Sequence, residues 1–211
     1  RFSPDGRRLL TIEGPGGAAP TLDVTDAATG AHMGSVQLHG VTMSAHGERA
    51  NVVTVSPDSA FIAVQTDAGE IRLLDLETLE PLGTLVGLTQ LGAGVGFSSD
   101  GRYLAGVSSS GALKVWSAAT RASPYRVRAD SMVAPSAFAI DRAGRRAAQG
   151  DWGRIILRDA RTGEHQWCIF PSLEGWQDLD FDPEGLTLAA VGERGTVLRL
   201  DARTGRVLAS A

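Results

Sequence analysis

The chain has very little cysteine. Cys168 is the single cysteine among 211 residues, so no disulfide can form within the chain. It lies in the apolar stretch Trp167-Cys168-Ile169-Phe170, where a thiol is more often a buried packing group than a nucleophile. We therefore predict a buried structural thiol and no cysteine chemistry.

Long apolar runs and runs of one charge are also missing. No segment reaches the roughly 20 apolar residues of a membrane-spanning helix, and we expect no secretory leader. The 20 basic and 24 acidic residues give a net charge of -4 without a polybasic stretch. This composition predicts a cytoplasmic protein whose partner is neither nucleic acid nor a membrane.

Lysine is nearly absent, since Lys114 is the one lysine among the 20 basic residues. Together with abundant Ala, Arg and Gly, this bias is typical of a GC-rich bacterial genome. The chain also begins at Arg1, without a methionine and inside a repeating unit. We therefore expect a bacterial sequence that is a piece of a longer protein.

A threonine returns at a nearly fixed interval along the chain. The steps between successive copies are 49, 42, 42 and 42 residues, at Thr29, Thr78, Thr120, Thr162 and Thr204. An acidic residue stands three places before each, except in the third unit, where Ser117 takes its place. A period in the low forties, with turn residues at fixed offsets, predicts a stacked-repeat architecture.

Each repeat contains short β-favouring runs separated by turn residues, without helical periodicity. In the third unit these runs end at Phe97, Val107, Ser117 and Val127. A Ser-Pro-Asp-Gly turn follows the first run in the first unit, at Ser3 to Gly6, and an Asp-x-x-Thr-Gly turn follows the third run in several units. The sequence thus predicts an all-β chain of four-stranded antiparallel sheets.

These two turns resemble those of the WD-repeat β-propeller family. The resemblance covers the whole chain as five units, 1–50, 51–92, 93–134, 135–176 and 177–211. It is degenerate, because only Trp116 occupies the family's tryptophan position and only His46 its histidine position. The resemblance implies blades held mainly by apolar packing, and a non-catalytic scaffold that binds proteins.

Two other propeller types share parts of the pattern. Asp159 to Gly163 with Trp167 resembles quinoprotein propellers, and lactonase-type propellers also use the Ser-Pro-Asp-Gly turn. The alternative function is therefore a fragment of a propeller enzyme with a site in its central channel. The first unit lacks most of its inner strand, so we expect five consecutive blades of a seven-bladed ring, whose missing blades or domains would be partners, with a closed five-bladed ring as the alternative.

The irregular features of the repeats gather on one predicted face. The first unit is longer than the others by insertions within 14–20 and 36–51. Both insertions, and also Trp152 and Trp176, fall in connections that emerge on the same side of antiparallel blades. We predict that Trp152 and Trp176 bind a protein partner on this face, with two rings that cap the core as the alternative.

No group of residues makes a convincing reaction site. Asp178 and Asp180 share one face of a strand, but the other units carry no acidic residue at the position of Asp180, so we interpret them as solvated charges near the channel. Three histidines spaced by seven residues fall on no common face, at His32, His39 and His46. We predict no catalytic residue, no metal site and no cofactor.

Overall fold

A computed structural model describes residues 1–14, 19–41, 52–88, 94–108, 112–119, 125–127 and 136–211. Every regular element in these ranges is a β-strand, and the strands form five antiparallel sheets. The predicted all-β fold with sheets of propeller type is confirmed. The five sheets are named blades 1 to 5 in chain order.

Blade 1 has three strands, β1 (Arg8–Glu13), β2 (Thr21–Asp26) and β3 (His32–Gln37). Blade 2 holds β4 (Val53–Val55), β5 (Phe61–Gln65), β6 (Ile71–Asp75) and β7 (Pro81–Leu85). Blade 3 holds β8 (Gly94–Phe97), β9 (Tyr103–Val107), β10 (Leu113–Ser117) and β11 (Tyr125–Val127). Blade 4 holds β12 (Ala137–Ile140), β13 (Arg146–Gly150), β14 (Ile155–Asp159) and β15 (His165–Ile169). Blade 5 holds β16 (Trp176–Phe181), β17 (Thr187–Gly192), β18 (Val197–Asp201) and β19 (Val207–Ser210).

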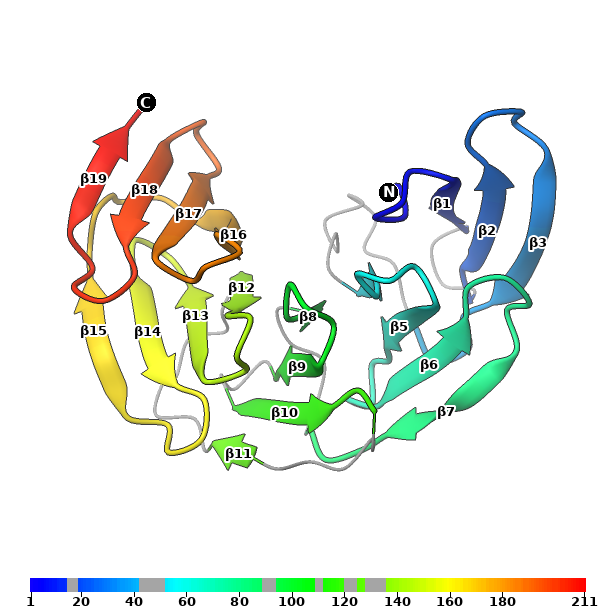
Figure 1. Cartoon of the computed structure of the whole chain (residues 1–211), viewed down its shortest axis with the longest axis horizontal. Helices are drawn as coiled ribbons and strands as arrows, with labels where there is room; N and C mark the ends of the chain where they lie inside the picture. The colour runs from blue at the N-terminus through cyan, green and yellow to red at the C-terminus, as the bar shows by residue number, and fades with distance from the viewer. Residues whose placement is uncertain (15–18, 42–51, 89–93, 109–111, 120–124, 128–135) are drawn as a thin grey trace.

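The blades stand side by side in an open arc (Figure 1). Each blade is a meander in which strands adjacent in sequence are adjacent in the sheet. The first strands of blades 2 to 5 line the inside of the arc, and the last strands lie on its outside (Figure 1). In blade 1 the place of the inner strand is marked by a single bridge between Phe2 and Leu9. The arc does not close between blade 5 and blade 1, so the structure is not a closed five-bladed ring, and the total blade number stays a prediction.

The apolar core lies between the blades. Each of four clusters joins the facing sides of two neighbours, in order from blades 1 and 2 to blades 4 and 5. Trp116, the one tryptophan at the family position, is buried in the cluster between blades 2 and 3. The apolar packing that the resemblance implied is therefore present between each pair of neighbouring blades.

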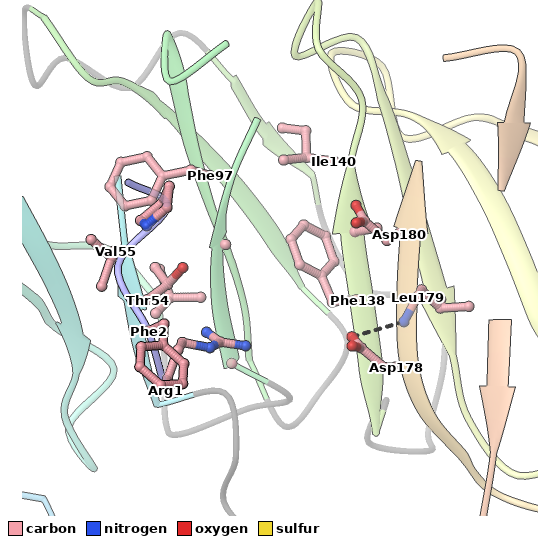
Figure 2. A pocket seen from close by; sticks show the side chains of 15 residues that line it. Arg1, Phe2, Thr54, Val55, Phe97, Phe138, Ile140, Asp178, Leu179 and Asp180 are labelled. Carbon is pink, nitrogen blue, oxygen red and sulfur yellow. Dashed lines mark hydrogen bonds between the residues drawn. The ribbon is translucent and has the colours of Figure 1, made fainter. Parts of the chain in front are cut away.

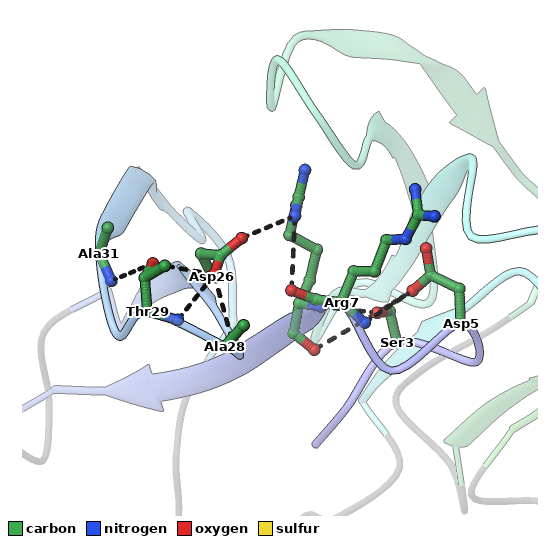
Figure 3. A network of polar contacts seen from close by, with 8 residues as sticks. Ser3, Asp5, Arg7, Asp26, Ala28, Thr29 and Ala31 are labelled. Atoms are coloured by element: carbon green, nitrogen blue, oxygen red, sulfur yellow. Dashed lines mark hydrogen bonds and ion pairs between the residues drawn. The ribbon is translucent and has the colours of Figure 1, made fainter.

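Hydrogen bonds within the turns set the ends of the strands. Ser3 Oγ donates to Asp5 Oδ1 over 2.6 Å, and the same carboxylate oxygen accepts the N–H of Arg7 over 3.0 Å (Figure 3). The Ser98 and Asp100 pair repeats this contact in blade 3 at 2.8 Å. The predicted Ser-Pro-Asp-Gly turn thus closes on its own side chains.

The Asp-x-x-Thr turns use a second carboxylate in the same way. Asp26 Oδ1 accepts the N–H and the hydroxyl of Thr29, over 2.9 and 2.8 Å (Figure 3). These bonds stabilise the ionised carboxylate, so the pKa of Asp26 lies below its usual value. Gly30 ends the turn at a φ of 71°, where a side chain would be strained.

One sequence prediction is wrong. Cys168 is exposed, because it lies on β15, the outer strand of blade 4, and pairs there with Ile156 at the sheet edge. Its neighbours Trp167 and Ile169 pack partly against the core between blades 4 and 5, whereas Cys168 points the other way. Partial desolvation raises the pKa of its thiol, which keeps the reactive thiolate scarce.

Candidate partner-binding face

The candidate site is built from two connections of blades 4 and 5. One is the turn between β13 and β14, and the other is the connection from β15 to β16. The N–H of Gly153 donates to the carbonyl oxygen of Glu174 over 2.6 Å and joins the two. Gly153 has a φ of 74°, and a Cβ there would lie 2.8 Å from the carbonyl oxygen of Ser172. Only glycine fits this close approach.

Three large apolar side chains project into solvent around this junction. Trp152 is 62% exposed, Phe170 73% and Leu173 83%. Trp152 adjoins Gly153, which packs against the backbone of Ser172 and Leu173, and Phe170 follows directly on β15. We name Trp152, Phe170 and Leu173 the apolar triad. Exposed large apolar side chains that gather at one junction favour an interaction site there.

Buried polar groups hold the junction in one geometry. Glu174 is 2% exposed, and its carboxylate accepts the N–H of Arg194 over 2.6 Å and the hydroxyl of Ser172 over 3.0 Å. A hydrogen bond from Thr196, the largest effect, and the one from Arg194 lower the pKa of Glu174. The carboxylate therefore stays ionised and ties the connection before β16 to the turn after β17.

A charged pair frames the same junction on the side of blade 4. Arg154 Nε donates to Asp151 Oδ2 over 3.0 Å across the β13–β14 turn. Because both side chains are largely withdrawn from solvent, the pair fixes the turn that carries Trp152.

The structure separates the two tryptophans that the sequence grouped together. Trp152 is exposed on the predicted face, but Trp176 is fully buried in the cluster between blades 4 and 5. The Cβ of Trp176 fills the space beside Gly150, since a Cβ built there would lie 2.8 Å away. Trp176 therefore packs into the core, as in the alternative prediction, and its buried ring cannot contact a partner. For Trp152 partner binding stays a prediction.

Sequence reasoning missed Phe170 and Leu173. Phe170 directly precedes Pro171, and Leu173 follows it by two residues, in the connection between two strands. Large apolar residues in such a connection were a usable signal. The two insertions of the first unit fall largely on 15–18 and 42–51, which lie outside the described residues. His46 also lies outside the described residues, so the structure does not test the prediction that the three histidines fall on no common face.

A cavity of about 310 Å³ lies between the inner strands (Figure 2). Thr54, Phe97 and Phe138 line it from blades 2 to 4, and Asp178 and Asp180 line it from blade 5. The two carboxylates share one face of β16, as predicted. Desolvation, and then the charge of Asp178, raise the pKa of Asp180. Asp178 accepts the N–H of Leu179 over 3.0 Å.

The described residues bring no further reactive groups together. Within them, no set of three His, Cys, Asp or Glu side chains is placed to hold a metal ion. Over the same ranges, no helix is long and apolar enough to cross a membrane.

The comparison with known families agrees with the repeat pattern. Residues 83–117 match the family described as WD domain, G-beta repeat. The match begins in β7 of blade 2 and ends at Ser117, the last residue of β10 in blade 3. The resemblance to WD-repeat propellers is thus confirmed at this unit, and the chain contains a WD repeat, a type of unit that generally mediates protein–protein interaction. No curated protein matches the chain.

Proposed function

We propose that this chain is a non-catalytic scaffold that binds a protein through the apolar triad. The observation that carries the proposal is the exposure of Trp152, Phe170 and Leu173 on one rigid junction. Monomeric proteins seldom expose several large apolar side chains at one junction unless it is an interaction site. The WD-repeat match at 83–117 supports the same class of function.

The triad suits the centre of a protein interface. Fully burying a Phe or Leu side chain contributes about 1.5–3 kcal/mol, and tryptophan is enriched among the residues that dominate binding energy. Hydrogen bonds from the backbone and the buried Glu174 fix the turn beneath the rings, so little conformational entropy is lost on binding. The partner is therefore a protein with an apolar pocket or groove.

The wider setting is also a proposal. The near absence of lysine and the abundance of arginine favour a bacterial protein. The resemblance to WD-repeat propellers favours a signalling or regulatory role, which we place in the cytoplasm. Further blades or domains of the same polypeptide would complete the assembly in which the scaffold acts.

A second candidate function rests on the inner cavity. Asp178 and Asp180 face a space walled by Phe97 and Phe138, where a raised carboxyl pKa suits proton transfer (Figure 2). A propeller enzyme with a central-channel site would lose turnover when Asp180 is replaced by Asn. If the chain is a non-catalytic scaffold, the same variant should bind its partner as tightly as the unchanged chain.

Site-specific photo-crosslinking tests the scaffold proposal. A photoreactive phenylalanine replaces Leu173 in one protein and Leu186 in its control, and both are irradiated in the native cell. Leu186 is 68% exposed but lies in the turn after β16, on the opposite, regular face. We expect a discrete crosslinked protein from position 173, lost when Trp152 is also changed to Ala, and none from position 186. Equal products from both positions would contradict the proposal.

A further inference from the structure

Two exposed arginines from neighbouring blades approach one carboxylate on the regular face, away from the apolar triad. Arg102 ends the turn between β8 and β9 in blade 3, and Arg142 lies in the turn between β12 and β13 in blade 4. Their Nε atoms lie 3.8 and 3.9 Å from the same oxygen, Asp100 Oδ2. The side chains of Arg102 and Arg142 are 80% and 63% exposed, and that of Asp100 is 14% exposed. We name Arg102 and Arg142 the arginine pair.

Asp100 holds the arginine pair by charge alone. The two separations exceed hydrogen-bond length, and among the described residues neither guanidinium group donates a hydrogen bond. The other oxygen of Asp100 accepts the hydroxyl of Ser98 over 2.8 Å and the N–H of Arg102 over 3.0 Å, so this carboxylate also holds its own turn. One negative charge therefore faces two positive ones, and the planar donor groups of both arginines stay accessible to a ligand.

The turn of blade 4 closes without a carboxylate at the surface. In blade 1 the exposed Asp5 accepts the N–H of Arg7, and Ser3 accepts that of Arg8. Asp141 takes the position of Ser3 in blade 4. It is 4% exposed, and its Oδ1 accepts the two equivalent N–H groups over 2.8 and 3.1 Å. One buried carboxylate thus replaces a serine and an exposed aspartate.

This replacement changes the charge at the surface of blade 4. Ala143 takes the place of Asp5, and Arg142 takes that of Pro4. Ala143 and Arg142 are both exposed, and so is Arg145 in the same turn. The segment 141–146 therefore presents two exposed arginines and no exposed carboxylate.

The turns on either side carry the opposite charge. The corresponding segments are 56–61 in blade 2 and 182–187 in blade 5, and neither contains a basic residue. Asp58 lies in the first segment, and Asp182 and Glu184 lie in the second. A long polyanion would meet these carboxylates as well, whereas a compact anion would contact the arginine pair alone.

The two turns that carry the arginine pair are packed against each other. A Cβ built on Gly144 would lie 2.5 Å from the ring of Tyr103, the residue after Arg102. The carbonyl oxygen of Arg102 accepts the N–H of Ala118 over 2.9 Å. Because these contacts hold the backbone of both turns, a ligand orders only the two side chains.

We propose that the arginine pair binds a phosphate monoester, carried either by a protein side chain or by a small molecule. The planar guanidinium group matches phosphate oxygens with two parallel hydrogen bonds, and a compact dianion balances the positive charge that Asp100 balances only in part. Since the pair lies on the face opposite the apolar triad, this site does not depend on the proposed scaffold function.

NMR of the arginine Nε–H groups of the unchanged chain tests the site. The probes are inorganic phosphate and a blocked phosphoserine tripeptide, at low salt and at a pH of about 7.5, where both are largely dianionic. We expect saturable shifts of the Arg102 and Arg142 signals with both probes. Acetate and the unphosphorylated tripeptide should bind at least about tenfold more weakly. Tighter binding of the phosphotripeptide than of inorganic phosphate supports a phosphorylated protein as the ligand, and the reverse order supports a small phosphate. Acetate that binds as tightly as phosphate overturns the proposal.

Variants of the exposed turn residues test the geometry. Ala143→Asp restores the surface carboxylate of the blade 1 turn without removing an arginine, and should weaken phosphate binding about fivefold or more by repulsion, whereas Ala143→Asn should not. Arg142→Gln should weaken phosphate binding about tenfold or more, and Arg7→Gln, an exposed arginine of the matching turn in blade 1, should leave it unchanged. Unaltered binding in Ala143→Asp, or equal losses in Arg142→Gln and Arg7→Gln, overturns the proposal.

Discussion

The N–H of Gly153 donates a hydrogen bond of 2.6 Å to the carbonyl oxygen of Glu174 and links the β13–β14 turn to the connection before β16. This bond places Trp152 beside Leu173, although 20 residues separate them in sequence. Because Glu174 also holds Arg194 through its side chain, one residue joins three connections of two blades. Hydrogen bonds therefore hold the backbone that carries the apolar triad in one conformation.

Gly153→Ala should disrupt the junction between the β13–β14 turn and the connection before β16. The new methyl group would lie 2.8 Å from the carbonyl oxygen of Ser172, at a φ of 74° that alanine disfavours. We expect the free energy of unfolding to fall by about 1–3 kcal/mol. Urea unfolding measures the change, and Gly195→Ala is the control, because it has a similar φ but nothing within 4 Å of the added Cβ. An equal loss of unfolding free energy in both variants would mean that backbone strain is the whole effect and that no clash occurs at Ser172.

The two tryptophans of the predicted binding face should behave in opposite ways. Trp176→Ala removes a fully buried ring from the core between blades 4 and 5, and should cost about 3–5 kcal/mol of folding free energy. Trp152→Ala removes an exposed ring and should change stability by less than about 0.5 kcal/mol. Thermal melting of both variants checks this. Similar losses would mean that the two rings share one environment.

Ser59→Gly should stabilise the protein. Ser59 has a φ of 56° at the turn position that Gly6 holds in blade 1, with a φ of 71°. A non-glycine residue in this conformation costs about 1–2 kcal/mol, offset in part by the 3.2 Å hydrogen bond from the Asp5 N–H to Ser59 Oγ. We expect the free energy of unfolding, measured by thermal unfolding, to rise by about 0.5–1 kcal/mol. The reverse change, Gly6→Ser, should destabilise the matching turn, and a gain there would contradict this account.

The turn carboxylates should make stability depend on acid pH. The N–H of Thr78, and then that of Glu77, lower the pKa of Asp75 below its ordinary value of 3.8. A lowered folded pKa means that the ionised group stabilises the fold fully above the unfolded value. This stabilisation is lost as the pH falls through the folded pKa. We expect Asp75→Asn to lower stability at pH 7 and to reduce the loss between pH 7 and acid pH. If Asp75→Asn lowered the free energy of unfolding equally at every pH, ionisation of Asp75 would be excluded as the cause of the pH dependence.

The repeat pattern predicted the strands well because turn residues act locally. Asp26 with Thr29, and Ser3 with Asp5, bond within a few residues of each other, so their spacing alone indicates the turn. The exposure of a single strand residue depends on which blade lies against it. Cys168 was therefore predicted wrongly, and Trp176 looked equivalent to Trp152. Cys168 points away from the core between blades 4 and 5, whereas Trp176 lies inside it, and these contacts between blades are not contained in the spacing of the repeats.

The most direct test of the scaffold account is the affinity of the crosslinked partner for three purified proteins, measured by isothermal titration calorimetry. These are the unchanged chain, Trp152→Ala and Leu186→Ala, with the melting temperature of each recorded. We predict that Trp152→Ala weakens binding by about 2 kcal/mol or more, roughly 30-fold, at an unchanged melting temperature. Leu186→Ala should bind like the unchanged chain. Unaltered affinity in Trp152→Ala, or an equal loss in Leu186→Ala, would contradict the claim that the apolar triad binds the partner.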